Sequence, residues 1–280
     1  MLDLLISPFE YKFMLYALII SVLISIPASL LSCFLVLKGW SLIGDAISHA
    51  VLPGIVIAYL LNIPLLIGAF AAGLFCSIAT GFIKDNSRVK EDTVMGVVFS
   101  GMFALGIVMH TKIETNVHLD HILFGNLLGI NQDDLIFSIL LSSITISILA
   151  IKWKDLLVFC FDLVHARTIG LNLKTLHYGL LIILSLTIVS NLKAVGIILS
   201  IALLIIPGST AFLLTRNFKK MLLISSITTV SSSIMGVITS FYLDSATAPT
   251  IVIFMSIIFV CSYVIFSLKK IYYTTKHAKN

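Results

Sequence analysis

The chain has 280 residues, of which 59% are hydrophobic and only 11% charged, and its formal net charge is +5. A water-soluble domain carries about 25% charged residues, so this composition excludes an ordinary soluble domain. Because the basic residues of membrane proteins gather in cytoplasmic loops, the positive charge does not indicate a nucleic-acid partner.

Apolar segments long enough to cross about 30 Å of hydrocarbon as helices recur along the chain. In chain order they cover residues 13–37, 41–61, 63–83, 94–110, 135–151, 176–192, 194–214, 220–242 and 247–268. The stretch 119–130 is too short to span and predicts an interfacial or re-entrant segment. We therefore predict an all-α, polytopic transmembrane bundle of eight to nine spans, with residues 1–280 forming one domain. The number is eight if two neighbouring runs form one broken helix.

The basic residues predict the orientation of these spans. If the segments 38–40, 84–93, 152–175, 215–220 and 269–280 are cytoplasmic, they hold 15 of the 18 Lys and Arg residues. This asymmetry predicts an N-terminus outside and a C-terminus in the cytoplasm. The chain contains no GxxxxGK[ST] phosphate-binding loop, so any ATP-driven function requires a separate ATPase subunit.

The second span carries the most informative polar pair. Asp45 and His49 are four residues apart, so on a helix they lie on one face. Ionisable side chains inside a span are costly unless they meet a partner or a water-filled pathway. A carboxylate and an imidazole also form half of a site for a divalent metal ion, and two copies at a dimer axis would supply four ligands.

Small residues and a proline accompany this pair. Ala46, Ala50 and Gly54 form a stripe that allows another backbone to approach closely. Pro53 has no amide hydrogen, so the carbonyl of His49 loses its helical donor and a kink is expected.

Three other interpretations of Asp45 and His49 remain open. They could only hydrogen-bond neighbouring helices. They could carry protons, with Asp45 as the proton-binding group of an ion-coupled carrier that acts without an ATPase. They could catalyse hydrolysis inside the membrane, although no HExxH pattern or second catalytic carboxylate accompanies them.

Several stretches resemble the ABC-transporter permeases that import zinc, manganese or chelated iron. They are GDAISHAVLPG (44–54), KEDTVMGVVFSGMFALG (90–106), FDLVHARTIGLNLKTLHY (161–178) and AVGIILSIALLIIPGSTAFLLT (194–215). The resemblance covers nearly the whole chain. WSLIGDAISHAVLPG and HILFGN favour the manganese and iron branch over the zinc branch.

The resemblance implies a permease subunit that is not an enzyme and binds no cofactor of its own, while ATP binds to the partner subunits. It implies a dimer with a second copy or a related permease, two cytoplasmic ATPase subunits and an extracytoplasmic metal-binding protein. The location it implies is the bacterial inner membrane, surrounded by lipid. Asp45 and His49 match the positions expected to touch the transported manganese, iron or zinc ion.

Three further segments have candidate roles. The segment 153–175 resembles the family's cytoplasmic coupling segment, in which Asp162, Ala166, Arg167 and Gly170 would meet the ATPase. Two of these, Ala166 and Gly170, predict a small-residue helix face. Pro207 predicts a second helix break, which either marks a pathway or is compensated by the hydroxyls that follow it. The outer loop 110–122 contains a group of metal-capable side chains, which could bind metal, dock a donor protein or simply form a polar loop; they are His110, Glu114, His118, Asp120 and His121.

Overall fold

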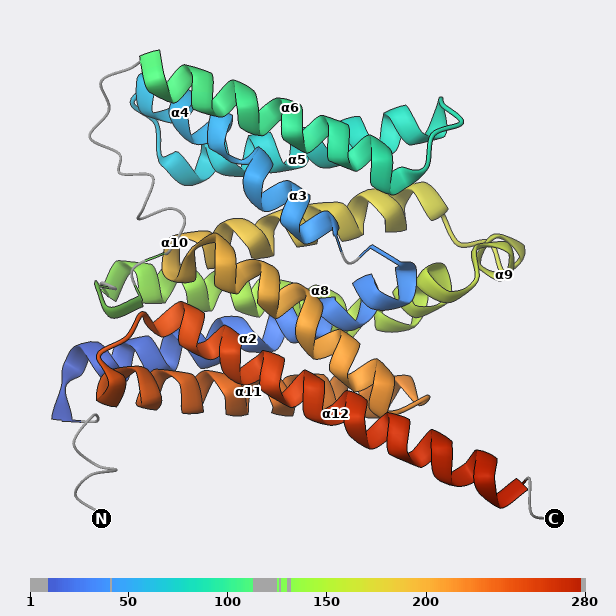
Figure 1. Cartoon of the computed structure of the whole chain (residues 1–280). Helices are drawn as coiled ribbons and strands as arrows, with labels where there is room; N and C mark the ends of the chain where they lie inside the picture. Colours follow the sequence, from blue (N-terminus) through green and yellow to red (C-terminus); the bar gives the residue numbers. More distant parts are fainter. Residues whose placement is uncertain (1–9, 41, 113–124, 126, 130–131, 278–280) are drawn as a thin grey trace.

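A computed structural model describes residues 10–40, 42–112, 125, 127–129 and 132–277 (Figure 1). In chain order the helices are α2 (Lys12–Lys38), α3 (Ile43–Ala50), α4 (Leu52–Leu60), α5 (Leu65–Asp85), α6 (Glu91–Lys112), η2 (Leu127–Gly129), α8 (Gln132–Phe161), α9 (Leu163–Thr168), α10 (Leu173–Leu214), α11 (Phe218–Leu243) and α12 (Thr247–His277). Within these residues nine segments are long and apolar enough to cross a membrane, with α3 and α4 forming one and α10 forming two. The predicted helical bundle is confirmed, at the higher of the two expected span numbers.

The spans differ in how much of their surface the chain itself covers. Within an apolar 18-residue window of each span, 67% of the residues of α2 and 72% of those of the α3–α4 span are buried. In α6 and in α12 only 17% of the residues in such a window are buried. Helix α10 contacts both groups of helices seen in Figure 1: α3 and α5 on one side, and α2, α8, α11 and α12 on the other. The α3–α4 span therefore lies in the interior of the bundle, although its surface is not fully covered.

Hydroxyl groups join α2 to α11 in the lower part of Figure 1. The hydroxyls of Ser25 and Ser233 lie 2.7 Å apart, and the Ser225 hydroxyl donates to the carbonyl of Ser29 at 2.9 Å. Small hydrogen-bonding residues let membrane helices approach closely where the hydrophobic effect gives no net attraction. These contacts fix α2 against α11.

A glycine divides the 42-residue helix α10 into two spans. Gly196 has φ 75° and ψ −176°, which is non-helical backbone inside α10. Gly125, with φ 66°, lies so close that a Cβ there would overlap the backbone of Val195 and Gly196. The predicted boundary between residues 192 and 194 is therefore confirmed to within a few residues.

The connectors fall into two groups at opposite ends of the bundle. Residues 39–40, 42, 86–90, 162–172 and 215–217 lie at the end where α12 finishes, on the right of Figure 1, and α2 begins at the other end. This alternation matches the segments that the basic residues predict to be cytoplasmic.

Candidate functional site

Helix α3 brings Asp45 and His49 together on one face. The Nε2 atom of His49 lies 3.3 Å from the Oδ1 atom of Asp45, and the two side chains are 28% and 36% exposed. The other residues of α3 between Ile43 and Ala50 are buried against the chain. The polar pair is therefore the part of α3 that the rest of the chain leaves partly open.

Two aromatic rings of α6 surround the imidazole of His49. The ring centroid of Phe103 lies 5.1 Å away in an edge-on arrangement, and that of Phe99 lies 6.3 Å away in a stacked one. The Nδ1 atom of His49 is buried and has no hydrogen-bond partner in the described part of the chain. Only the Nε2 atom, which faces Asp45, is placed to bind a ligand.

The geometry of the pair suits two ligands of one metal ion. A carboxylate oxygen and an imidazole nitrogen each bind a divalent transition metal at about 2.0–2.2 Å, so neighbouring ligands lie about 3 Å apart. Within the residues that the structure describes, no group of three or more His, Cys, Asp or Glu side chains could hold a metal ion. The pair alone is thus half of such a site, and further ligands would have to come from outside this set of residues.

The helix is interrupted directly after the pair, as the proline predicts. Helix α3 ends at Ala50 and α4 begins at Leu52, with Pro53 in its first turn. Val51 keeps helical backbone angles (φ −68°, ψ −25°), so the chain continues in the same direction from α3 into α4. The interruption is a break in the helical hydrogen bonding. Gly106 of α6 packs against Pro53, because a Cβ there would lie 2.9 Å from the proline ring.

The small-residue stripe serves contacts within the chain. Ala46 and Ala50 are buried, and Gly54 of α4 meets Gly68 of α5. A Cβ on either glycine would overlap the carbonyl oxygen of the other. The predicted close backbone approach is confirmed, with α5 as the approaching helix.

At Pro207 the prediction of a helix break was wrong. Helix α10 continues through Pro207, and the non-helical angles lie at Gly196 instead. The amide that follows the proline has a tertiary partner, because the amide of Gly208 donates to the hydroxyl of Ser32 on α2 at 2.9 Å. The hydroxyls of Ser209 and Thr210 donate to the carbonyls of Ile205 and Ile206, both at 2.8 Å, and not to the carbonyl of Leu203 that the proline frees.

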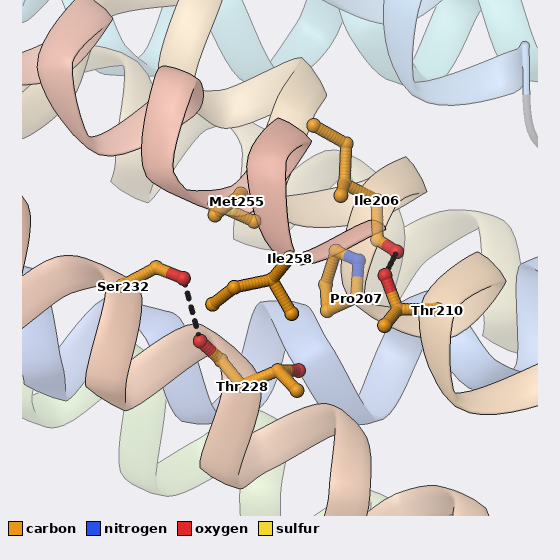
Figure 2. A pocket seen from close by; sticks show the side chains of 7 residues that line it. All are labelled: Ile206, Pro207, Thr210, Thr228, Ser232, Met255 and Ile258. Atoms are coloured by element: carbon orange, nitrogen blue, oxygen red, sulfur yellow. Dashed lines mark hydrogen bonds between the residues drawn. The ribbon is translucent and has the colours of Figure 1, made fainter. Parts of the chain in front are cut away.

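The recess beside Pro207 is too tight to hold a water molecule. Figure 2 shows its lining residues: Ile206, Pro207, Thr210, Thr228, Ser232, Met255 and Ile258. The hydroxyls of Thr210 and Ser232 donate to carbonyls of their own helices. In this conformation the recess offers no space for an ion.

The segment 153–175, for which a coupling role is predicted, contains a short capped helix, α9. Asp162 caps its N-terminus and accepts hydrogen bonds from the amides of Val164 and His165 at 2.9 and 3.0 Å. Gly170 follows the helix with φ 80°, and the amide of Leu171 returns to the carbonyl of Ala166 at 3.0 Å. This left-handed C-terminal turn explains why glycine stands at position 170.

The predicted small-residue face of this helix was wrong. Ala166 is fully buried against its own chain, and Gly170 lies beyond the end of α9. The exposed side chains of this segment include four large apolar ones beside polar ones such as Arg167; the four are Phe161, Leu163, Val164 and Ile169. These four residues, which we call the α9 patch, were missed because residues in a connector between spans were expected to meet water. Their apolar side chains within a short capped segment were the available signal.

The outer histidine-rich loop lies mostly outside the described residues. His110 is partly buried in the last turn of α6. The predicted group formed by Glu114, His118, Asp120 and His121 falls in 113–124, which the structure does not describe.

Known proteins resemble this chain over almost its full length. Residues 10–266 match the family model described as "ABC 3 transport family". A "Probable iron transport system membrane protein" of Haemophilus influenzae is 55% identical over 260 residues, covering 93% of this chain and 96% of that protein. The "Manganese transport system membrane protein MntB" of Synechocystis is 47% identical and covers 93% of this chain and 85% of that protein.

The fold also matches a solved structure. The structure described as "PsaBC from Streptococcus pneumoniae in complex with Fab" superposes with a TM-score of 0.84 at 34% sequence identity, covering 93% of this chain and 94% of that one. The relatives carry the iron and manganese names expected from the branch that the second span resembles. The chain is a multi-pass membrane protein and belongs to the ABC 3 transport family.

Proposed function

We propose that this chain is the membrane-spanning subunit of an ATP-driven importer of divalent metal ions, with manganese or iron preferred over zinc. One observation carries the proposal: a carboxylate oxygen and an imidazole nitrogen lie 3.3 Å apart on the partly exposed face of α3, a helix whose other residues are buried. The iron and manganese names of the relatives support this choice of ion.

Asp45 and His49 bind the ion transiently during its passage. The chain supplies two ligands, and a second permease, identical or related, supplies another pair across a shared axis. Four protein ligands replace most of the water around the ion. Because nitrogen and oxygen sites bind later transition metals more tightly than manganese or iron, selectivity comes from geometry and delivery. The interruption at Pro53 gives this span a joint beside the bound ion.

Two ATPase subunits bind at the end of the bundle that carries α9. The α9 patch is a contact surface for them, because exposed apolar side chains in a connector favour burial against another protein. Asp162 holds the helix in shape, Arg167 adds a charged contact at its edge, and Gly170 forms the turn that follows. A metal-binding protein delivers the ion at the opposite end, outside the bacterial inner membrane, and the C-terminus of the chain is cytoplasmic.

Metal uptake by cells that contain the complete transporter tests this function. At matched membrane levels, Asp45→Ala and His49→Ala should each lower uptake of the transported ion at least ten-fold. Asp85→Ala is the matched control, because this exposed carboxylate at the last residue of α5 lies outside the candidate site and the segment 153–175, and it should stay within two-fold. Normal uptake by the Asp45 and His49 variants would contradict the site.

Reconstitution with the ATPase distinguishes this function from an ion-coupled carrier. Liposomes that contain ATP should accumulate the metal without a proton gradient. Accumulation that requires a proton gradient and proceeds without the ATPase would contradict ATP-driven import.

A further inference from the structure

A group of four side chains connects the two ends of the coupling segment to the start of α3. We call it the Trp40 junction; its members are Lys38, Trp40, Phe159 and His177. Trp40 lies between α2 and α3 and is only 3% exposed. Its amide donates to the carbonyl of Leu35 at 2.8 Å, and Gly39 before it has φ 77°, so the turn out of α2 is fixed.

His177 on α10 is the main ring contact of Trp40. The two ring centroids lie 5.1 Å apart in an edge-on arrangement, and the centroid of Phe159 on α8 lies 6.4 Å from that of His177. Gly81 of α5 completes the enclosure, since a Cβ there would lie 3.1 Å from the Nε2 atom of His177. The ring of Trp40, the ring of Phe159 on α8 and the backbone of α5 at Gly81 thus lie around the ring of His177.

Lys38 joins the same group to the end of α8. Its Nζ atom donates to the carbonyl of Phe159 at 3.3 Å and lies 4.0 Å above the centroid of the Phe159 ring. The same atom lies 5.7 Å from the centroid of Trp40. Phe159 is three residues before Asp162, which caps α9, and His177 is in the first turns of α10, which follows α9. The junction therefore contacts both helices that flank α9.

The other side of the junction is the first turn of the helix that carries the candidate site. The amide of Ile43 donates to the carbonyl of Trp40 at 3.1 Å, and Asp45 and His49 follow on the same helix. A helix moves as a stiff rod, so a displacement of Trp40 changes the position of both side chains.

We propose that Trp40 and His177 are positioning residues that connect movement of α9 to the orientation of α3, and so to the Asp45–His49 pair. This inference rests on the proposed function. When the ATPase subunits displace α9, the last turn of α8 and the first turns of α10 move with it. The rings of Phe159 and His177 then shift Trp40 and change the geometry in which the ion is held.

The test measures ATP hydrolysis and metal uptake in one preparation of the complete transporter in liposomes with its donor protein. In Trp40→Ala and His177→Ala, uptake should fall at least five-fold while hydrolysis stays within two-fold of the unmodified protein. The ATP consumed per ion therefore rises. Trp40→Phe keeps a ring and should restore most of the uptake. His177→Leu fills much of the same volume as histidine. If the alanine variants do not fold, this variant is used to measure the ATP consumed per ion.

Phe218→Ala is the matched control. The Phe218 ring on α11 meets Phe34 of α2 edge-on at 5.0 Å, so this variant also loses an edge-on ring contact, here between α11 and α2. Its ATP consumed per ion should be unchanged. If the unmodified transporter fails to accumulate metal with ATP, the proposed function fails. If it succeeds and the ATP consumed per ion is unchanged in the Trp40 and His177 variants, the junction proposal alone is overturned.

Discussion

The Phe103 ring stands edge-on to the imidazole of His49, with 5.1 Å between the centroids and 72° between the planes. Phe99, one turn earlier on α6, stacks on the same imidazole. An aromatic pair contributes about 0.5–1.5 kcal/mol beyond the area it buries. The two rings thus hold the His49 side chain with its Nε2 atom facing Asp45.

Replacing Phe103 should weaken metal uptake without abolishing it. Phe103→Leu keeps an apolar contact but loses the ring edge, so the half-saturating metal concentration should rise about three-fold, equivalent to about 0.7 kcal/mol. Phe75→Leu, at a 62% exposed position on α5, is the control and should leave the half-saturating metal concentration unchanged. An unchanged value for Phe103→Leu would show that the ring does not orient His49.

Adding a methyl group at Gly54 should destabilise the protein. The new Cβ would overlap the carbonyl of Gly68, so α4 and α5 must separate, at a cost of about 1–3 kcal/mol. Thermal unfolding of the purified protein should show a lower midpoint for Gly54→Ala. Gly96→Ala is the control, because a Cβ there meets no heavy atom within 4 Å, and helical alanine stabilises by about 0.5–1 kcal/mol relative to glycine. Equal midpoints for the two variants would contradict the close packing of α4 on α5.

Removing the cap of α9 should weaken binding of the ATPase. Asp162→Ala loses two hydrogen bonds to backbone amides, which costs about 1 kcal/mol of helix stability. Hydrogen exchange of the α9 amides should become faster, and less ATPase should copurify. Asp162→Asn retains the acceptor and should behave like the unmodified chain. Asn217→Ala removes a similar cap from α11 and should leave copurification unchanged. Equal copurification with Asp162→Ala would contradict a role for α9 in this contact.

The contact between Ser32 and Gly208 should contribute measurably to stability. Ser32→Ala leaves the buried amide of Gly208 without its acceptor, which costs about 1–3 kcal/mol. The unfolding midpoint should fall more than in Ser231→Ala, whose hydroxyl donates only within its own helix. Equal shifts in the two variants would show that the proline region of α10 does not depend on α2.

The sequence predicted the spans well because membrane thickness fixes the length of an apolar helix. It also placed Asp45 and His49 on one face, since their spacing matches a helical turn and α3 is regular there. The first prediction depends on the length of an apolar run and the second on helical spacing. Both are local properties of the sequence that neighbouring helices do not alter.

The remaining features depend on contacts between distant segments. The amide of Gly208, next to Pro207, donates to Ser32, which lies far away in the sequence. Ala166 is buried because α9 folds back on its own chain, and Phe103 meets His49 only once α6 packs on α3. Each of these contacts joins residues that are far apart in the chain, so no local pattern of residues predicts it.

Metal affinity of cysteine variants at the candidate site tests the central claim most directly. The purified transporter, without its donor protein, is titrated with manganese and with zinc, and the two dissociation constants are compared. A thiolate is a softer ligand than imidazole or carboxylate and favours zinc. If Asp45 and His49 touch the ion, Asp45→Cys and His49→Cys should each raise the preference for zinc over manganese at least ten-fold. His49→Ala should weaken the binding of both ions. An unchanged preference in both cysteine variants would contradict direct contact between these side chains and the transported metal.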